Sequence, residues 1–262
     1  HNTNSLGHNT HILGHNTNSL GANNTNKYMV IHPLNIFIST KKDSNYIFCI
    51  NKTNVDRIDY DNIFHNAFFM KMVDILNTCF EKEREYHISL GSYSHGYKHD
   101  LDTIKSNVHN PRFETLILVS EQLEPISFLY IEKNEDDYDK IWTVCTNKEY
   151  RGKGMSSTLL NYMIVKQLNK KRNKMLLEVY EDNIISRDPN NDIIQKQIMG
   201  LFGSKGFEHT PLDKLQRHTF NNLLSNTGET KIMIHNPKKW LQLNSHEKRN
   251  LNNNGRISCG CN

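Results

Sequence analysis

The spacing of apolar residues divides the chain into strand-like and helix-like segments. Three apolar runs rich in β-branched and aromatic residues predict successive strands at residues 113–120, 125–133 and 140–146. Beyond residue 154 the period changes, and the apolar positions recur at spacings of three and four, as in an amphipathic helix. These positions begin with Met155, Leu159, Leu160 and Met163. A short polar stretch with two glycines joins the last strand to this helix, so we expect the order strand, turn, helix.

The same patterns extend the prediction along the chain. Apolar runs flanking a polar turn predict a β-hairpin within residues 34–51. Further strands are expected at 175–180, 207–210 and 229–235, and helices at 65–85, 100–108, 193–204 and 237–249. Asp61 or Asn62 is the expected N-cap of the helix that starts near His65. Strands and helices alternate, which predicts a mixed α/β fold.

Both ends of the chain differ from this middle part. Residues 1–21 repeat a seven-residue unit rich in Asn, Thr and Ser, and glycine closes each unit. Such units do not favour a coiled coil and bury too little apolar surface to fold, so we expect disorder through residue 27 and a folded part that begins near Met29. Residues 237–262 should hold a short helix and a disordered Asn-rich tail. The histidines of the repeat leave weak metal binding open as the alternative to plain low complexity.

Composition narrows the choice of partners. The formal net charge of +4 is modest and does not favour nucleic-acid binding. No apolar run reaches the ~20 residues of a membrane-spanning helix, and no signal-peptide pattern is visible. The five cysteines are scattered, which favours a reducing, cytoplasmic location. Cys259 and Cys261 supply only half of a metal site, so no metal is expected.

The polar turn before the long helix is the strongest candidate for chemistry. It reads Arg151-Gly152-Lys153-Gly154. The first turn of a helix leaves backbone N–H groups without partners, and the helix dipole adds positive charge there. Glycines let a ligand approach the backbone, and the two cations add to the field. The turn therefore predicts a site for a phosphate or pyrophosphate.

The wider sequence around this turn resembles a known family. The resemblance rests on Val144-Cys145-Thr146, followed after three residues by Tyr150-Arg151-Gly152-Lys153-Gly154-Met155. The segments 175–183, which ends in Asn183, and 201–207, which ends in Gly-Phe, follow in the right order. Together they closely resemble the GNAT superfamily of N-acetyltransferases over about residues 65–236. The turn is not a Walker A motif, because Gly-Lys-Ser/Thr is missing. It is not a dinucleotide fingerprint either, because the third glycine is missing.

The resemblance implies a fold, a co-substrate and a set of contacts. The implied fold is a mostly antiparallel sheet of six to seven strands with one splayed parallel pair, flanked by about four helices. The implied co-substrate is acetyl-CoA. Its pantetheine would pair with the backbone of Val144, Cys145 and Thr146. The other implied contacts are Arg151, Gly152, Lys153, Gly154, Met155, Ser156, Asn183 and Phe202. The implied domains are 28–64, a hairpin extension with the first strand, and 65–236, the acetyltransferase.

Acetyl transfer requires a neutral amine. A lysine-like amine has a pKa near 10.4, so its neutral form costs about 4–5 kcal/mol at pH 7. Glu178 is the first candidate for the general base and Tyr180 the second; a structural role for Glu178 remains equally open. Relatives often carry a tyrosine where this chain has Phe202, which has no proton to give to the departing thiolate. Cys145 is expected to be buried rather than a nucleophile.

We therefore predict an N-acetyltransferase that transfers directly from acetyl-CoA to a primary amine. The alternative is a non-catalytic acyl-CoA-binding or interaction module. The acceptor and the oligomeric state carry no signature in the sequence. Histidines within residues 86–111 are either acceptor contacts or part of a solvated loop.

Overall fold

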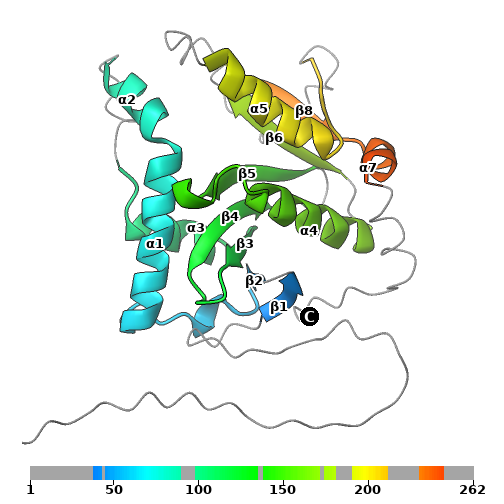
Figure 1. Ribbon diagram of the computed structural model, residues 1–262. Helices are drawn as coiled ribbons and strands as arrows, with labels where there is room; N and C mark the ends of the chain where they lie inside the picture. The colour runs from blue at the N-terminus through cyan, green and yellow to red at the C-terminus, as the bar shows by residue number, and fades with distance from the viewer. Residues whose placement is uncertain are drawn as a thin grey trace, which may run out of the picture.

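The protein is described by a computed structural model (Figure 1). The described residues are 38–42, 45–89, 98–134, 138–171, 174–180, 191–211 and 230–244. Several predictions fall outside them: the heptapeptide repeat, the start near Met29, Asn183, the stretch after residue 211 and the Asn-rich tail.

One mixed sheet forms the centre of the fold, with the strand order β1-β2-β3-β4-β5-β6-β8-β7. The strands are β1 (Ile38–Lys42), β2 (Asn45–Ile50), β3 (Phe113–Val119), β4 (Pro125–Glu132), β5 (Asp139–Thr146), β6 (Met175–Tyr180), β7 (Phe207–His209) and β8 (Thr230–His235). All neighbours pair antiparallel except β5 and β6, which are parallel. The predicted fold class is confirmed. The described strands number eight because the hairpin β1–β2 joins the same sheet.

Helices cover both faces of this sheet (Figure 1). The described helices are α1 (Ile63–Cys79), α2 (Glu81–Ser89), α3 (Leu101–His109), α4 (Met155–Asn169), α5 (Asn191–Ser204) and α7 (Pro237–Leu243), with short 3₁₀ turns η1 (Val55–Arg57) and η3 (Lys148–Tyr150). Apolar residues of α1 and α3 pack on one face, in a cluster with Phe48, Phe128 and Tyr130. Residues of α4, α5 and α7 pack on the other face, in a cluster with Leu129 and Leu177.

Burial on both faces explains the continuous apolar runs of the central strands. Every residue of β4 is buried, and in β3 only Phe113 is partly exposed. A strand covered by helices on both sides has no polar face, so its sequence does not alternate. Burial on both faces is therefore the reason that the sequence is continuously apolar over most of residues 113–120 and 125–133.

The helix predicted at 65–85 is two helices. α1 ends at Cys79, and α2 begins two residues later at Glu81. Phe80 lies between them and packs against the α1-side core, whereas α2 is mostly charged. Asn62, rather than Asp61, is the N-cap of α1, and its side chain accepts from the amides of Phe64 and His65. None of the helices in the described part of the chain combines the length and apolarity that a membrane crossing needs.

Candidate active site at the parting of two parallel strands

The strands β5 and β6 pair at one end only. Their parallel register runs through Asp139, Lys140 and Ile141 and stops there. At the same level the register between β4 and β5 shifts by one residue, which leaves Trp142 as an extra residue of β5. Such a bulge bends a strand and increases its twist. We infer that the bulge turns β5 away from β6, so that among the described strands residues 142–146 pair with β4 alone (Figure 1).

The parting exposes an unpaired backbone edge. The Asn147 amide donates to the Ile126 carbonyl at 2.8 Å, which places alternate residues of β5, including Cys145, in hydrogen bonds to β4. The N–H and C=O groups of Val144 and Thr146 therefore point to the other side, toward the gap, where the Thr146 carbonyl accepts from Arg151 and Cys79. The backbone of Cys145 does not face that edge, and its carbonyl also accepts from Ser127 Oγ at 2.7 Å. Of the three residues predicted to pair with a pantetheine, two present their backbone to the gap.

The turn after β5 depends on two glycines in the left-handed region. Gly152 has φ +74° and Gly154 has φ +79°. A Cβ built on either residue meets no atom within 4 Å. Packing thus does not explain these glycines, whereas the backbone conformation does, and the open space beside them leaves room for a ligand.

Several backbone amides of the turn have no partner. Among the described residues, none accepts a hydrogen bond from the amides of Gly152, Gly154, Met155 or Ser156. Gly154 is the N-cap of α4 and, being glycine, offers no side-chain cap. These N–H groups lie at the positive end of a helix of 15 residues. The arrangement is suited to bind an anion such as a pyrophosphate.

A chain of hydroxyl groups fixes this turn to the sheet. Thr146 Oγ1 lies 2.5 Å from Ser156 Oγ and 2.8 Å from Ser127 Oγ. Because Ser127 donates its single proton to the Cys145 carbonyl, Thr146 donates to Ser127 and Ser156 donates to Thr146. β4, the end of β5 and the first turn of α4 are thereby held in one geometry.

The two cations of the turn have different surroundings. The Arg151 guanidinium donates to the Thr146 carbonyl at 3.2 Å and to the Thr78 carbonyl at 3.3 Å, so it links the turn to the end of α1. Lys153 is exposed, and its Nζ lies 5.3 Å from the centre of the Tyr150 ring. Lys153 is thus the cation of the turn that is free to meet a ligand, while Arg151 holds the turn in place.

An ion pair spans the two strands at the point where they part. Lys140 Nζ of β5 lies 3.1 Å from Glu178 Oε1 of β6, and both side chains are at least nine-tenths buried. Lys140 Nζ also lies 3.9 Å from the centre of the Trp142 ring. The Trp142 indole is 51% exposed and donates its N–H to Glu132 Oε2 at 2.7 Å. Glu178 therefore stands at the head of the gap, but it shares its charge with a buried lysine.

The remaining predicted site residues lie away from the unpaired edge or have side chains that the structure does not describe. Phe202 is buried in α5 and packs edge-on against Phe207 at 6.1 Å between ring centres. Tyr180 is the last residue of β6, and nothing further is described of its side chain. His99 packs on Phe80, and burial lowers the pKa of its imidazole. His109, the last residue of α3, lies with its ring centre 5.6 Å from that of Tyr60, so both His99 and His109 contact aromatic side chains of the fold.

Sequence reasoning missed Trp142, Ser127 and Cys79. An exposed tryptophan inside an apolar strand run carries no sequence signal, because the bulge that exposes it depends on the register with β4. Ser127 is a single hydroxyl in a buried strand. Only its position opposite Thr146 gives it a role.

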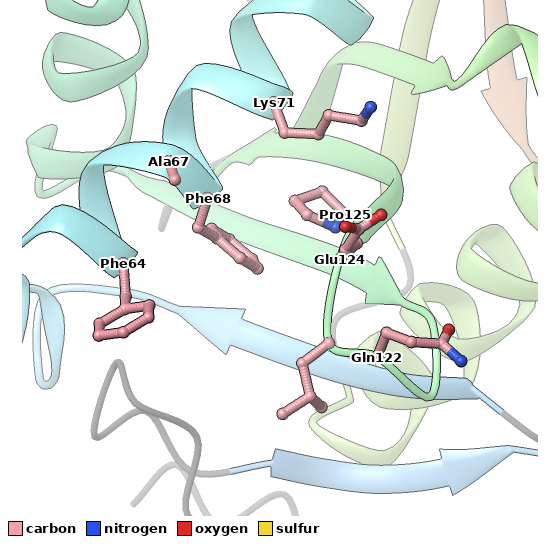
Figure 2. Close-up of a pocket in the computed structure, with 8 residues that line it drawn as sticks. Phe64, Ala67, Phe68, Lys71, Gln122, Glu124 and Pro125 are labelled. Atoms are coloured by element: carbon pink, nitrogen blue, oxygen red, sulfur yellow. The ribbon is translucent and has the colours of Figure 1, made fainter. Parts of the chain in front are cut away.

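A hollow of about 300 Å³ lies between α1 and the turn that joins β3 to β4 (Figure 2). Its lining is mixed, with Phe64, Phe68 and Pro125 beside Lys71 and Glu124. No residue of the turn 151–156 lines it, so we do not assign it to the candidate site. Within the described ranges, no group of three or more His, Cys, Asp or Glu side chains is arranged to hold a metal ion.

Comparison with known proteins identifies the class. Residues 69–188 match the model of the family described as "Acetyltransferase (GNAT) family". Residues 69–188 therefore match an acetyltransferase domain of the GNAT superfamily, and this match supports acyl transfer in general. No curated protein matches the sequence.

Solved structures with a related arrangement are distant in sequence. An acetyltransferase from Streptococcus agalactiae is 14% identical with a TM-score of 0.48, and the match covers 74% of this chain and 99% of that one. For Tetrahymena GCN5 the identity is 11%, the TM-score 0.45 and the coverage 67% and 89%. For PaiA N-acetyltransferase from Thermoplasma acidophilum, solved in complex with coenzyme A, the values are 13%, 0.41, 64% and 92%. The identification rests on the family model rather than on these likenesses.

Proposed function

We propose that the chain transfers an acetyl group from acetyl-CoA to a primary amine, directly and within a ternary complex. The observation that carries the proposal is the unpaired edge of β5, which leads without interruption into a turn of unpartnered amides. An extended pantetheine needs an edge with which to pair, and a pyrophosphate needs N–H donors at its end. Here the two features are consecutive in the chain.

Each part of this edge would have its own task. The C=O of Val144 and the N–H of Thr146 would pair with the amide groups of the pantetheine. The amides of Gly152, Gly154 and Met155 would bind the pyrophosphate, and the ammonium of Lys153 would supply a point charge. The contribution of a charge-assisted hydrogen bond is about 1.5–3 kcal/mol, so several together hold the donor firmly.

The thioester must be polarised as well as held. In this arrangement the N–H of Val144 would face the thioester oxygen and stabilise the negative charge that develops on it. The loss of one such donor typically raises the barrier by about 2.7–4 kcal/mol in other enzymes. Because the donor is a backbone group, this contribution depends on strand geometry rather than on side-chain identity.

Glu178 is the proposed base that makes the amine neutral. Its place at the head of the gap, across from the open edge, supports this role. The contact of its Oε1 with Lys140 Nζ at 3.1 Å holds the carboxylate in this place. A proton taken from the amine would pass on through water to solvent.

The departing thiolate requires a proton source other than Phe202. The phenyl ring is buried against Phe207 and has no exchangeable proton. A water molecule or the Tyr180 hydroxyl would take this role. If neither does, acyl transfer is slow, which is the basis of the second candidate function.

The second candidate is a module that binds acyl-CoA without turnover. It is favoured by two observations, the phenylalanine at position 202 and the ion pair that occupies Glu178. The two functions differ in turnover but not in donor binding.

Turnover distinguishes the two candidates. The full chain is incubated with acetyl-CoA and a panel of peptides, polyamines, aminoglycosides and small amines, and free thiol is followed. The proposal predicts thiol release that requires both an amine and the protein, with acetylated amine formed in equal amount. Saturable binding of coenzyme A with no thiol release on any amine would instead establish the binding module.

A further inference from the structure

Two cysteines lie close together beside the turn of residues 151–156, which we call the donor turn. Cys79 is the last residue of α1, and Cys145 is the second-last residue of β5. Cys145 belongs to the α1-side core, and Cys79 packs against that core from its rim. The Cys79 thiol donates to the carbonyl of Thr146, the residue that follows Cys145, at 3.7 Å. The fold thus brings together two thiols that are 66 residues apart in the sequence.

The surroundings of Cys79 favour its thiolate. Arg151 Nη2 donates to the Cys79 sulfur at 3.7 Å, and its positive charge stabilises the thiolate. The hydrogen bond from Cys145, which outweighs the opposing effect of burial, and the charge of Arg151 lower the pKa of Cys79 to about 7. The side chain is only partly buried, so a small solute can reach it, whereas Cys145 is 1% exposed. These are the features of a reactive thiol with a second thiol behind it.

We propose that Cys79 and Cys145 form a redox-active pair that closes to a disulfide when the protein meets hydrogen peroxide. The pair is a modification site distinct from the acyl-transfer chemistry, and it does not rest on the proposed function. Its position matters because the same Arg151 that contacts Cys79 also holds the donor turn.

The reaction needs peroxide as its only co-reactant. The Cys79 thiolate attacks one peroxide oxygen, the O–O bond breaks, and hydroxide leaves, which gives a sulfenic acid on Cys79. The Cys145 sulfur then attacks the Cys79 sulfur. An S–S bond forms, the S–O bond breaks, and the hydroxide that leaves takes the Cys145 proton to become water. In total, two thiols and one peroxide give one disulfide and two waters, and two electrons pass from sulfur to oxygen.

Cys49 provides a comparison within the chain. It is a buried thiol on β2, fully enclosed on the α4 side of the sheet, with Lys166 Nζ at 3.0 Å from its sulfur. A cation near the sulfur without access from solvent should leave it unreactive in the native state. Oxidation that depends on both a thiolate and access should therefore select Cys79 over Cys49.

The test is oxidation of the native full chain followed by mass spectrometry. Cys259 and Cys261 are first replaced by serine, so that the remaining thiols are Cys49, Cys79 and Cys145. The protein is treated with stoichiometric peroxide at pH 7, alkylated and digested. We expect a cross-linked Cys79–Cys145 peptide that is two hydrogens lighter than the reduced pair, while Cys49 stays free.

Two variants define the order of the steps. In Cys145→Ser the reaction should stop at a sulfenic acid on Cys79, which dimedone traps. In Cys79→Ser no cross-link should form, and Cys145 should remain a thiol. Circular dichroism of each variant verifies that it is folded, and the wild-type cross-link by itself decides the question if a variant fails to fold.

A third variant tests the role of Arg151. The replacement Arg151→Gln should slow alkylation of Cys79 by iodoacetamide at pH 6 by about threefold, because the neighbouring cation is lost. No cross-link in the wild type, or oxidation of Cys49 at the same rate as Cys79, would overturn the proposal. Neither outcome bears on acyl transfer, which is measured separately by thiol release.

Discussion

Three glycines with positive φ have different reasons to be glycine. Gly152 and Gly154 lie in open space, so only the backbone conformation excludes other residues. Gly206 has φ +77°, and a Cβ there would lie 2.8 Å from Trp240 Cβ and 3.0 Å from the Asn236 carbonyl. The sequence marks all of them as members of a resembling motif. The structure separates two that border a ligand site from one that lets α7 pack on the sheet.

Replacement of Gly154 by alanine should weaken donor binding more than it weakens the fold. A left-handed backbone costs an alanine roughly 1–2 kcal/mol, and the new methyl group points into the space where a ligand would lie. We expect Gly154→Ala to lower the affinity for coenzyme A at least about tenfold, measured by isothermal titration calorimetry. Gly200→Ala is the matched control, since Gly200 lies in α5 with open space around it and no positive φ. It should leave the affinity unchanged.

Replacement of Gly206 by alanine should weaken the fold and leave donor binding unchanged. The strained backbone adds roughly 1–2 kcal/mol and the clash with Trp240 adds about 1–3 kcal/mol, so the free energy of unfolding should fall by about 2–5 kcal/mol. Urea denaturation measures the loss. The coenzyme A affinity of the folded fraction should not change. A variant as stable as the wild type would show that α7 does not pack as described.

The proposed role of Glu178 as general base is tested by replacing its carboxylate with the amide of glutamine. If Glu178 is the general base, Glu178→Gln should lower kcat by about 10²–10⁴-fold and leave the KM for acetyl-CoA near its wild-type value. Lys140→Gln is the companion variant, because it leaves the Glu178 carboxylate in place without its partner. Equal kcat in Glu178→Gln and wild type would exclude the base role.

Among the elements, the unit β5, turn, α4 and the strand β6 were predictable, and the pairing of the strands was not. Hydrophobic period and two glycines in a polar stretch are local signals, and they placed the strand end and helix start within a residue. The order β6-β8-β7, the bulge at Trp142 and the break at Phe80 depend on partners far along the chain. Periodicity does not contain such information, so the sequence predicted a splayed pair only through a family resemblance.

A buried ion pair joins α4 to β3. Lys166 Nζ lies 2.6 Å from Glu114 Oε1, and the two side chains are 1% and 6% exposed. Loss of one partner should cost about 3–5 kcal/mol, because it leaves a buried charge unpaired. We expect this loss in Glu114→Gln, measured by urea denaturation. Asp102→Asn, at the exposed pair with Lys105, is the control and should cost at most about 1 kcal/mol.

The same pair sets a pH dependence of stability. Burial acts to raise the pKa of Glu114, but the charges of Lys133 and Lys166 outweigh it and hold the pKa below its ordinary value. Burial acts to lower the pKa of Lys166, and its contacts with Cys49 and Glu114 outweigh it and raise the pKa. The contribution of Glu114 is thus present above about pH 5 and is lost as pH falls through its folded pKa, and that of Lys166 is lost as pH rises far above about 10.

This dependence can be measured by comparing two proteins. The difference in unfolding free energy between the wild type and Glu114→Gln should be largest between about pH 5 and 10 and should narrow on acidification. A difference that stays constant down to pH 3 would mean that Glu114 is not charged in the folded protein.

Over the described part of the molecule, the sheet and the helices on both of its faces leave one place where two neighbouring strands separate. The separation, the unpaired edge and the turn of free amides lie in one line, along β5 and into α4. A hydroxyl chain and Arg151 fix that line to β4 and α1. This arrangement supports the proposal that the molecule holds an extended, phosphate-bearing acyl donor, and the proposed acyl transfer depends on that binding.

The most direct test of this account is a titration of the full chain with acetyl-CoA, followed by calorimetry, alongside Gly154→Asp and the control Gly200→Asp. The account predicts saturable binding at one site per chain in the wild type and in Gly200→Asp. In Gly154→Asp the added carboxylate would face the pyrophosphate, so binding should be at least about a hundredfold weaker. No saturable binding in the wild type, or equal affinity in Gly154→Asp, would contradict it.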